Sequence, residues 1–312
     1  MRIGPLWSSW FGWKEFDVAV TAWTTNNSNE AANEFESMIR TLESVQHGNI
    51  TRFFGWCREG NKCLLVHEFI RRGDLEYALF NSPQSLSWND RVDVIIHICE
   101  ALCYLQKRQI LHRQVKASNI LLDAVWDAEK GHLVTKAKLN DFRLAKELVC
   151  GDNNSSADSK CENLSFGVEP PEAVKDGKFS EESDVYAFGS VILQIVTGKR
   201  TADPVPNSST FLLCNWVVEK GKNNCLGDAI DPKLGHLFRQ DEAIALLNLG
   251  LECLQPDRNK RPSIFESTTK STLRLPLRLR LKGASVQSTG KIKATGNTVS
   301  SSSGIVPDPV AQ

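Results

Sequence analysis

The stretch from Val185 to Val196 constrains the fold of this chain more than any other feature. It is the longest apolar run, and only Gly189, Ser190 and Gln194 interrupt it. These interruptions leave it short of the roughly 18 continuous apolar residues that are typical of a membrane span. A helix that is apolar on nearly all sides is enclosed by other elements, and 312 residues with 41% hydrophobic composition can supply that core. We therefore predict a buried central helix.

The elements on either side of this helix differ in character. In the first part of the chain we expect strands over 16–21, 50–57 and 63–69, and a helix over 30–45. After Gly73 the patterns turn helical, and we expect helices over 88–107, 181–197, 211–220 and 241–254. The predicted fold class is α+β, with a small β-rich lobe over 1–70 and a larger helical lobe over 71–268.

Composition excludes some classes of protein. Lysine plus arginine equals aspartate plus glutamate at 37 each, so the basic bias of a dedicated nucleic-acid binder is missing. The nine cysteines form an odd set without a CxxC pair, which favours reduced thiols over a disulfide framework. Cys99 and Cys103 share a helix face, where a metal contact is the alternative to burial in the core. The N-terminus lacks the pattern of a signal peptide, and we expect no membrane span.

The composition changes after residue 268. Residues 269–312 contain the string LRLPLRLRLKG, followed mostly by serine, threonine and glycine. Such a segment cannot offset the entropy lost on ordering, so we predict a disordered tail. Residues 270–312 carry seven basic groups against one acid, Asp308, which leaves a membrane or nucleic-acid contact as the alternative to a solvated tail.

Five motifs occur in one order: HRQVKASN (112–119), NDFRLAK (140–146), VEPPE (168–172), SDVYAFGSVILQIVTGKR (183–200) and CLQPDRNKRPS (253–263). Together they resemble the catalytic loop, magnesium loop, activation-segment end, central helix and late arginine of a protein kinase. The resemblance covers residues 17 to about 268. The strings FFGWCREGNKCLLVHEF and DAIDPKL are similar to plant receptor-like kinases, closest to the L-type lectin receptor kinases.

This resemblance implies a two-lobed protein kinase-like fold, with ATP and Mg²⁺ as cofactors and protein serine or threonine side chains as substrates. Members of the family are plasma-membrane receptors whose kinase domain lies on the cytosolic side. The chain as given is therefore expected in the cytoplasm. Its expected partners are other kinases or proteins of a receptor complex, and no specific nucleic acid.

The nucleotide-binding positions depart from the family pattern. Thr21 replaces the lysine that holds the α- and β-phosphates, and Met38 replaces the glutamate that pairs with this lysine. Loss of both charges leaves no buried unpaired charge, so the lobe can remain stable. Only Gly4 and Gly12 precede the VAV strand, so no glycine-rich cover is recognisable. Lys14 is the alternative source of a phosphate-binding charge.

The catalytic positions are partly kept. Gln114 replaces the aspartate that accepts the substrate proton, and an amide has no useful basicity. Lys116 is retained, and Asn119 and Asp141 match the family's metal ligands, although they could instead serve only to stabilise the loop. Arg143 replaces a glycine and places a cation beside the metal site, which weakens metal binding.

The structural positions of the family are retained. The resemblance assigns a hydrophobic spine across the two lobes to Leu42, Phe53, His112 and Phe142, anchored by Asp184. It also assigns a structural ion pair to Glu172 and Arg261. The fold is expected to survive although the chemistry is lost.

Two segments leave alternatives open. EKGHLVTKA (129–137) stands where the family has a tight hairpin, so we predict an exposed inserted loop, with a gene-model error as the alternative. Ser155, Ser156, Ser159 and Ser165 lie in the expected activation segment. They are either turn residues or phosphorylation sites whose phosphate could pair with Arg113.

Three functions follow from these residues. The first is an inactive pseudokinase that acts as a scaffold or allosteric partner in signalling. The second is a weakly active, ATP-dependent serine/threonine kinase that uses Asn119 and Asp141. The third is a decayed or misassembled gene product that folds poorly. An assay of nucleotide binding and turnover separates the first two, and a cooperative melt argues against the third.

Overall fold

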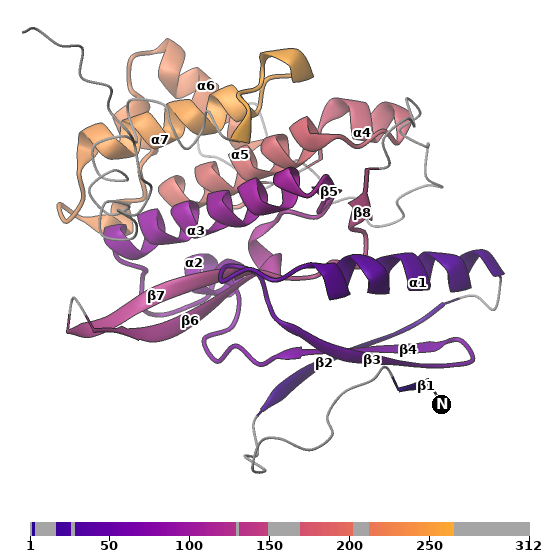
Figure 1. The fold of residues 1–312 in the computed structure, drawn as a ribbon. Helices are drawn as coiled ribbons and strands as arrows, with labels where there is room; N and C mark the ends of the chain where they lie inside the picture. Colours follow the sequence, from indigo (N-terminus) through magenta and orange to yellow (C-terminus); the bar gives the residue numbers. More distant parts are fainter. Residues whose placement is uncertain are drawn as a thin grey trace, which may run out of the picture.

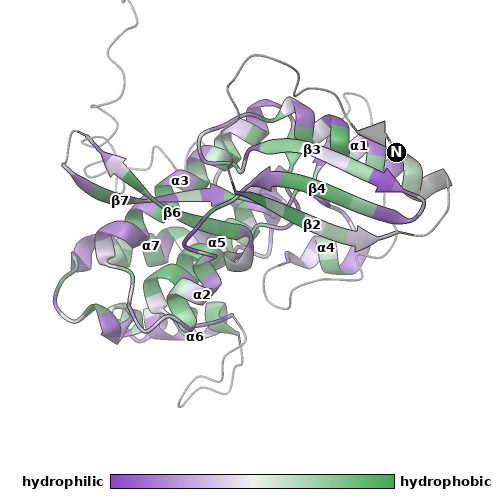
Figure 2. Ribbon diagram, turned by 90° about the horizontal axis from the view of Figure 1, so that it is seen from below, coloured by the Kyte–Doolittle hydropathy of each residue, from purple (hydrophilic) through white to green (hydrophobic). Residues whose placement is uncertain are grey.

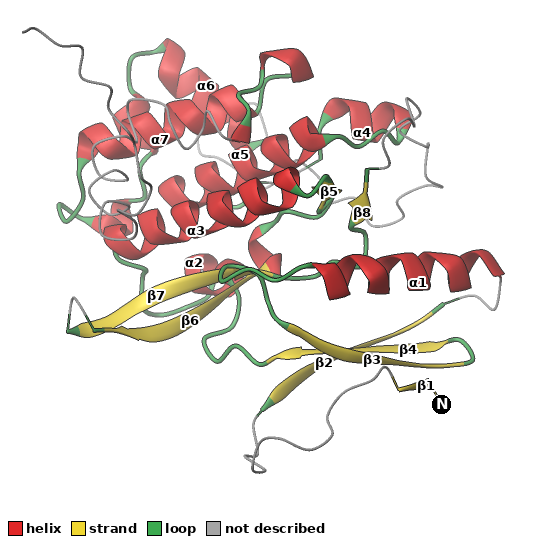
Figure 3. Cartoon of the chain, in the orientation of Figure 1, coloured by secondary structure: helices red, strands yellow, loops and turns green. Residues whose placement is uncertain are grey.

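The structure is a computed structural model that describes residues 2–3, 17–25, 29–128, 131–148, 169–201 and 212–264. Strands gather in one lobe and most of the helices in the other, as Figure 3 shows. The predicted α+β class with two lobes is confirmed. Three features of the sequence analysis lie outside the described residues. They are the predicted tail, the serines at 155, 156, 159 and 165, and the segment that contains Gly4, Gly12 and Lys14.

The small lobe is an antiparallel sheet covered by one helix (Figure 1). Its strands β1 (Arg2–Ile3), β2 (Val18–Thr24), β3 (Phe53–Glu59) and β4 (Lys62–Glu68) lie in the order β1-β3-β4-β2. Helix α1 (Asn29–Ser44) packs on one face, and the Phe35 ring lies 6.0 Å from that of Trp23 and 5.4 Å from that of Trp56. Because side chains alternate along a strand, Thr21 points to the same side as Trp23.

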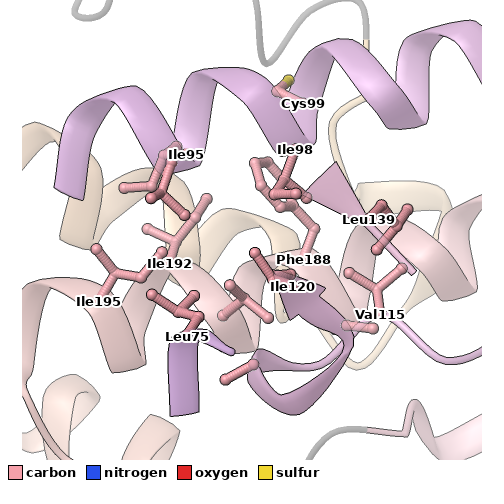
Figure 4. Close-up of a cluster of buried hydrophobic side chains, with 14 of the residues drawn as sticks. Leu75, Ile95, Ile98, Cys99, Val115, Ile120, Leu139, Phe188, Ile192 and Ile195 are labelled. Carbon is pink, nitrogen blue, oxygen red and sulfur yellow. The ribbon is translucent and has the colours of Figure 1, made fainter. Parts of the chain in front are cut away.

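The large lobe is built around α5 (Glu181–Thr197), and all but three of its residues are buried. This confirms the predicted central helix. The lobe also contains α2 (Leu75–Phe80), α3 (Trp88–Lys107), α4 (Pro171–Asp176), α6 (Leu213–Lys222) and α7 (Gln240–Cys253). Figure 4 shows Ile192 and Ile195 of α5 within the core beside Ile95 and Ile98 of α3.

Glycine is required where α5 and α7 meet. A Cβ added at Gly189 would lie 2.6 Å from Cβ of Cys253 and 2.8 Å from the carbonyl oxygen of Gly250. Such distances are shorter than van der Waals contact, so a larger residue would push the two helices apart. The glycine that interrupts the apolar run of α5 therefore permits close helix packing.

A hairpin of β6 (Ile120–Asp127) and β7 (His132–Leu139) leads out of the large lobe, to the left in Figure 1. The expectation of an inserted loop over 129–137 was wrong from residue 132 onward, because that part pairs with β6 and buries Thr135 and Ala137. Leu139 also bridges to Ile50, which joins the hairpin to the small lobe. Short strands β5 (Ile110–Leu111) and β8 (Lys146–Glu147) pair with each other beyond the end of α3.

The other expected elements are present with small shifts at their ends. The helices over 88–107 and 181–197 have the predicted bounds, and the remaining predicted strands and helices differ by up to three residues at an end. Figure 2 shows hydrophobic residues along β4 and β6. No helix in the described ranges combines the length and the hydrophobicity needed to cross a membrane.

Candidate active site

The loop from His112 to Asn119 lies between β5 and β6 and is anchored by α5. Asp184, in the first turn of α5, accepts hydrogen bonds from the backbone N–H groups of His112 at 2.7 Å and Arg113 at 2.8 Å. Burial raises the pKa of Asp184 to about 6. Arg113 has a φ of 66°, and this unusual conformation is held by the two bonds to one carboxylate.

His112 connects this loop to the segment after β7. Its buried ring packs edge-on against Phe142 at 4.7 Å, and Nε2 lies 3.0 Å from the carbonyl oxygen of Asn140. Nδ1 accepts a hydrogen bond from the backbone N–H of Gln114, so Nε2 carries the proton of the neutral ring. Burial lowers the pKa of His112 to about 4. The ring is therefore neutral at pH 7 and fixes the relative position of two site loops.

Gln114, Lys116 and Asn119 are brought together in the same loop. The side-chain N–H of Asn119 donates to the backbone oxygen of Gln114 at 2.9 Å, and Asn119 is buried. The Gln114 side chain can hydrogen-bond but cannot take up a proton near neutral pH. The loop therefore has the geometry of a catalytic loop without a general base at this position.

Asp141 and Arg143 form the dominant charge contact of the site. Nε and Nη2 of Arg143 each lie 2.6 Å from a different oxygen of the Asp141 carboxylate. Burial alone would raise the pKa of Asp141, but the hydrogen bonds and charge of Arg143 hold it below its ordinary value. A Mg²⁺ ion at Asp141 would share the carboxylate with this guanidinium, whose positive charge opposes metal binding. The pair therefore weakens Asp141 as a metal ligand.

The two positions at which the sequence predicted the loss of a lysine–glutamate pair carry no charge. Met38 of α1 is 6% exposed and packs in the main core, and Thr21 of β2 is half-buried. No charge stands at either position, so the sheet and α1 are joined here by packing alone.

Residues of β4 that the sequence did not single out also border the site. His67 is 5% exposed, its ring lies 5.6 Å from that of Phe53, and its Nδ1 has no hydrogen-bond partner among the described residues. Glu68 binds Nζ of Lys138 on β7 at 2.6 and 2.7 Å and accepts from the Arg52 backbone at 2.6 Å. Side chains alternate between the two faces of a strand, and His67 shares the buried face of β4 with Cys63 and Leu65. This alternation was the feature of the sequence that could have identified His67.

The remaining residues to which the resemblance assigns structural roles lie in or against the core. Leu42 and Phe142 lie in the main core, with Phe53 packed against it. Arg261 has a fully buried side chain and contacts Glu172 at 2.5 and 2.9 Å. The described residues hold no cluster of three or more His, Cys, Asp or Glu side chains suited to a metal ion. Cys99 lies in the core, as Figure 4 shows.

Comparison with known proteins matches the sequence of this chain to one family. The sequence profile of the family described as "Protein tyrosine and serine/threonine kinase" matches residues 10–270. The probable L-type lectin-domain containing receptor kinase S.5 of Arabidopsis thaliana is 33% identical over 262 residues, which are 81% of this chain and 38% of the relative. L-type lectin-domain containing receptor kinase IX.2 of the same plant is 34% identical, with 81% and 38% covered.

A further relative from Arabidopsis thaliana is the probable serine/threonine-protein kinase PBL2. It is 35% identical over 237 residues, which cover 75% of this chain and 53% of the relative. The chain thus spans about two-fifths of the lectin receptor kinases and about half of PBL2. The profile match, the identities and the order of the site loops together show that this chain belongs to the protein tyrosine and serine/threonine kinase family and is similar to plant receptor-like kinases.

Proposed function

We propose that this chain is a pseudokinase, a kinase domain that acts through its partners and does not transfer phosphate. The observation that carries the proposal is the ion pair between Arg143 and Asp141, whose two contacts are 2.6 Å long. Kinases of this family use Mg²⁺ to neutralise the phosphate oxygens of ATP. With Asp141 held by Arg143, Asn119 remains as a neutral ligand that cannot supply the missing negative charge.

The proton-accepting position supports the same proposal. A general base must combine hydrogen-bond reach with a pKa near the working pH, and the amide of Gln114 has no such pKa. The phosphate clamp supports it as well, because Thr21 and Met38 bring no charge to the positions of the lysine and its glutamate. Three independent requirements of phosphoryl transfer are therefore unmet in one site.

The anchoring contacts support a role as a folded binding partner. Asp184 still holds the catalytic loop, Arg261 still holds Glu172, and Glu68 joins β4 to β7 through Lys138. Since these contacts preserve the kinase shape, the domain can present its surfaces to other kinases or to proteins of a receptor complex. By analogy with the lectin receptor kinases, that role would be exercised on the cytosolic side of the plasma membrane.

A thermal-shift measurement with ATP, with and without Mg²⁺, tests the proposal. A ligand present at 100 times its dissociation constant stabilises the native state by about 2.7 kcal/mol, which raises the melting temperature clearly. We expect no such rise at millimolar ATP in either condition. A low-micromolar dissociation constant for ATP that depends on Mg²⁺ would overturn the proposal. So would clear phosphate transfer to a generic protein substrate, which would favour the weakly active serine/threonine kinase.

A further inference from the structure

A groove runs between the end of α1 and the start of β3, with a volume of about 840 Å³. We call it the α1–β3 groove. Its lining includes Val45, Phe53, Phe54 and Trp56, all of them half-buried, together with the charged residues Glu43, Arg52, Glu68 and Lys138. A hollow of this size with several aromatic walls is of the kind that takes up apolar side chains. Figure 1 shows the place, where α1 ends and the chain turns into β3.

The C-terminal part of the chain contains a segment with a matching pattern. Leucines stand at 273, 275, 277, 279 and 281, and the residues between them are Arg274, Pro276, Arg278 and Arg280, followed by Lys282. Strict alternation of this kind is the pattern of an extended strand with one apolar side. An extended segment would therefore present all five leucines to one surface and its basic groups to the other.

The described part of the chain ends against α3, the helix that also borders this groove. Ile264 is buried, and its carbonyl oxygen lies 3.9 Å from the thiol of Cys99 on α3. Tyr104, five residues further along α3, reaches the wall of the groove, because its hydroxyl accepts from the Gln46 backbone at 2.9 Å and its ring stacks on His47 at 4.9 Å. The exit point and the groove thus both contact α3, but on different sides of it, because five residues rotate about 140° beyond one full helical turn.

The length of chain between these points is sufficient. Residues 265–272 number eight and span at most roughly 26–29 Å when extended. The path needs to pass around α3, whose diameter with side chains is about 10–12 Å. A tether this short gives the segment an effective concentration of about millimolar order at the groove, so moderate intrinsic affinity is enough to fill it.

We propose that residues 273–281 of this chain dock in the α1–β3 groove, with the leucines against its aromatic wall. The basic side of the segment then meets solvent and α1, whose exposed charged residues are three acids and one base, namely Glu34, Glu36, Glu43 and Arg40. The groove thereby becomes a site for the chain's own tail on the side of α1 that faces α3. This inference does not depend on whether the domain transfers phosphate.

Photo-crosslinking of the full chain tests the docking. A photoreactive p-benzoylphenylalanine is placed at Leu277, and as a control at Ser288, which lies outside the alternating segment. We expect the first probe to form an intramolecular cross-link to a peptide within 42–56, on protein that migrates as a monomer. The control probe is expected to give no such product. A cross-link to another region, to a second copy of the chain, or no cross-link at all would overturn the proposal.

A matched pair of glycine substitutions gives a second test. Gly55 lines the groove, and a Cβ added there meets no atom within 4 Å, so Gly55→Gln adds a side chain to the lining from a position with open space at its Cβ. Gly221 on α6 has equally open surroundings, and Gly221→Gln is the control. Gly55→Gln should lower the cross-link yield at least about fivefold, because overpacking a contact surface weakens it. Equal yields in the two variants would contradict docking in the groove.

Discussion

Arg143 holds both carboxylate oxygens of Asp141, a residue only two positions away along the chain, through two contacts of 2.6 Å. The contact is possible because Asp141 adopts a φ of 67°, in the left-handed region, which turns the chain tightly between the two residues. The Asp141 side chain is 12% exposed and the Arg143 side chain is 42% exposed, so the cation closes the site from the solvent side.

Removal of this cation should open a metal site. Arg143→Gly is expected to strengthen the binding of Mn²⁺ alone to the full chain at least about tenfold, because a buried carboxylate regains both oxygens and loses an adjacent positive charge. Titration of Mn²⁺ followed by electron paramagnetic resonance measures the free ion directly. Unchanged affinity would show that Arg143 does not guard Asp141.

Arg239→Gly is the matched control for this experiment. Arg239 also pairs with an aspartate two residues away, Asp241, but both side chains are more than half exposed. Freeing that solvated carboxylate leaves the metal without neighbouring ligands, so the Mn²⁺ affinity should stay at the wild-type level. If the Mn²⁺ affinity rose as much as in Arg143→Gly, release of any exposed aspartate from its arginine would be enough to bind the ion.

Much of the Asp141 site could be predicted from the sequence, but its central contact could not. The motifs placed Gln114 and Asn119 in one loop and Asp141 in a second, because the residues within each motif stand at a fixed spacing along the chain. They also placed the Arg143 cation near the metal site. The bidentate contact depends on the backbone angle of Asp141, and local residue preferences do not specify that angle for a non-glycine residue.

Contacts between distant segments were the least predictable part of the fold. α3 was predicted at its observed bounds because its apolar periodicity is local and Ser87 caps its start. β7 was missed because a strand's stability comes from its partner, here β6. Likewise the pair of Glu68 and Lys138, 70 residues apart, has no local signature.

Breaking the buried ion pair of Arg91 and Asp231 should strongly destabilise the large lobe. Their side chains are 1% and 3% exposed and meet at 2.6 Å, and Arg91 also donates to the carbonyl oxygens of Leu86 and Ile195. Arg91→Met would leave Asp231 as an uncompensated buried charge, so we expect a loss of about 3–5 kcal/mol in the free energy of unfolding. Urea denaturation measures it.

An exposed arginine provides the comparison. Arg239 pairs with Asp241 at 3.3 Å with both side chains solvated, so Arg239→Met should change the free energy of unfolding by no more than about 0.5 kcal/mol. If Arg91→Met costs as little as Arg239→Met, the buried pair contributes nothing to the stability of the fold.

Asp184 and His112 should give opposite dependences of stability on pH. The folded pKa of Asp184 is about 6, above its ordinary 3.8, so its stabilising contribution is full below pH 3.8 and is lost as the pH rises through 6. The folded pKa of His112 is about 4, below its ordinary 6.5, so its contribution is full above pH 6.5 and is lost as the pH falls through 4. Each of the two pKa values differs from its ordinary value by about two, which corresponds to roughly 3 kcal/mol in the free energy of unfolding. Because the two contributions change in opposite directions with pH, they nearly cancel in the unsubstituted chain.

Single substitutions should separate the two dependences of stability on pH. With Asp184→Asn, the free energy of unfolding should rise with pH between 4 and 6.5, because the His112 contribution remains alone. With His112→Gln it should fall with pH over the same window, because the Asp184 contribution remains. Urea denaturation at several pH values tests both. Parallel pH profiles for the two variants would contradict the assignment, whatever their absolute stability.

The last prediction concerns repair of the catalytic loop. Gln114→Asp restores a carboxylate at the position of the base, yet the site would still lack the phosphate clamp, and Arg143 would still occupy Asp141. Residues that act as one unit are strongly non-additive, so one repair recovers little. We expect transfer of radiolabelled phosphate to a generic substrate to stay at background, with the unrepaired chain as the reference.

Repair of the clamp should require both of its halves. Met38 is 6% exposed, so Met38→Glu alone buries an unpaired acid and should lower the melting temperature. Thr21→Lys added to it supplies the partner, so the double variant should melt higher than Met38→Glu alone. Only when this pair is combined with Gln114→Asp and Arg143→Gly are the base, the clamp and the metal carboxylate present together. Phosphate transfer above background is therefore expected only from that quadruple variant. Clear turnover by Gln114→Asp alone would show that the missing base is the whole defect and that the Arg143–Asp141 pair does not block the metal.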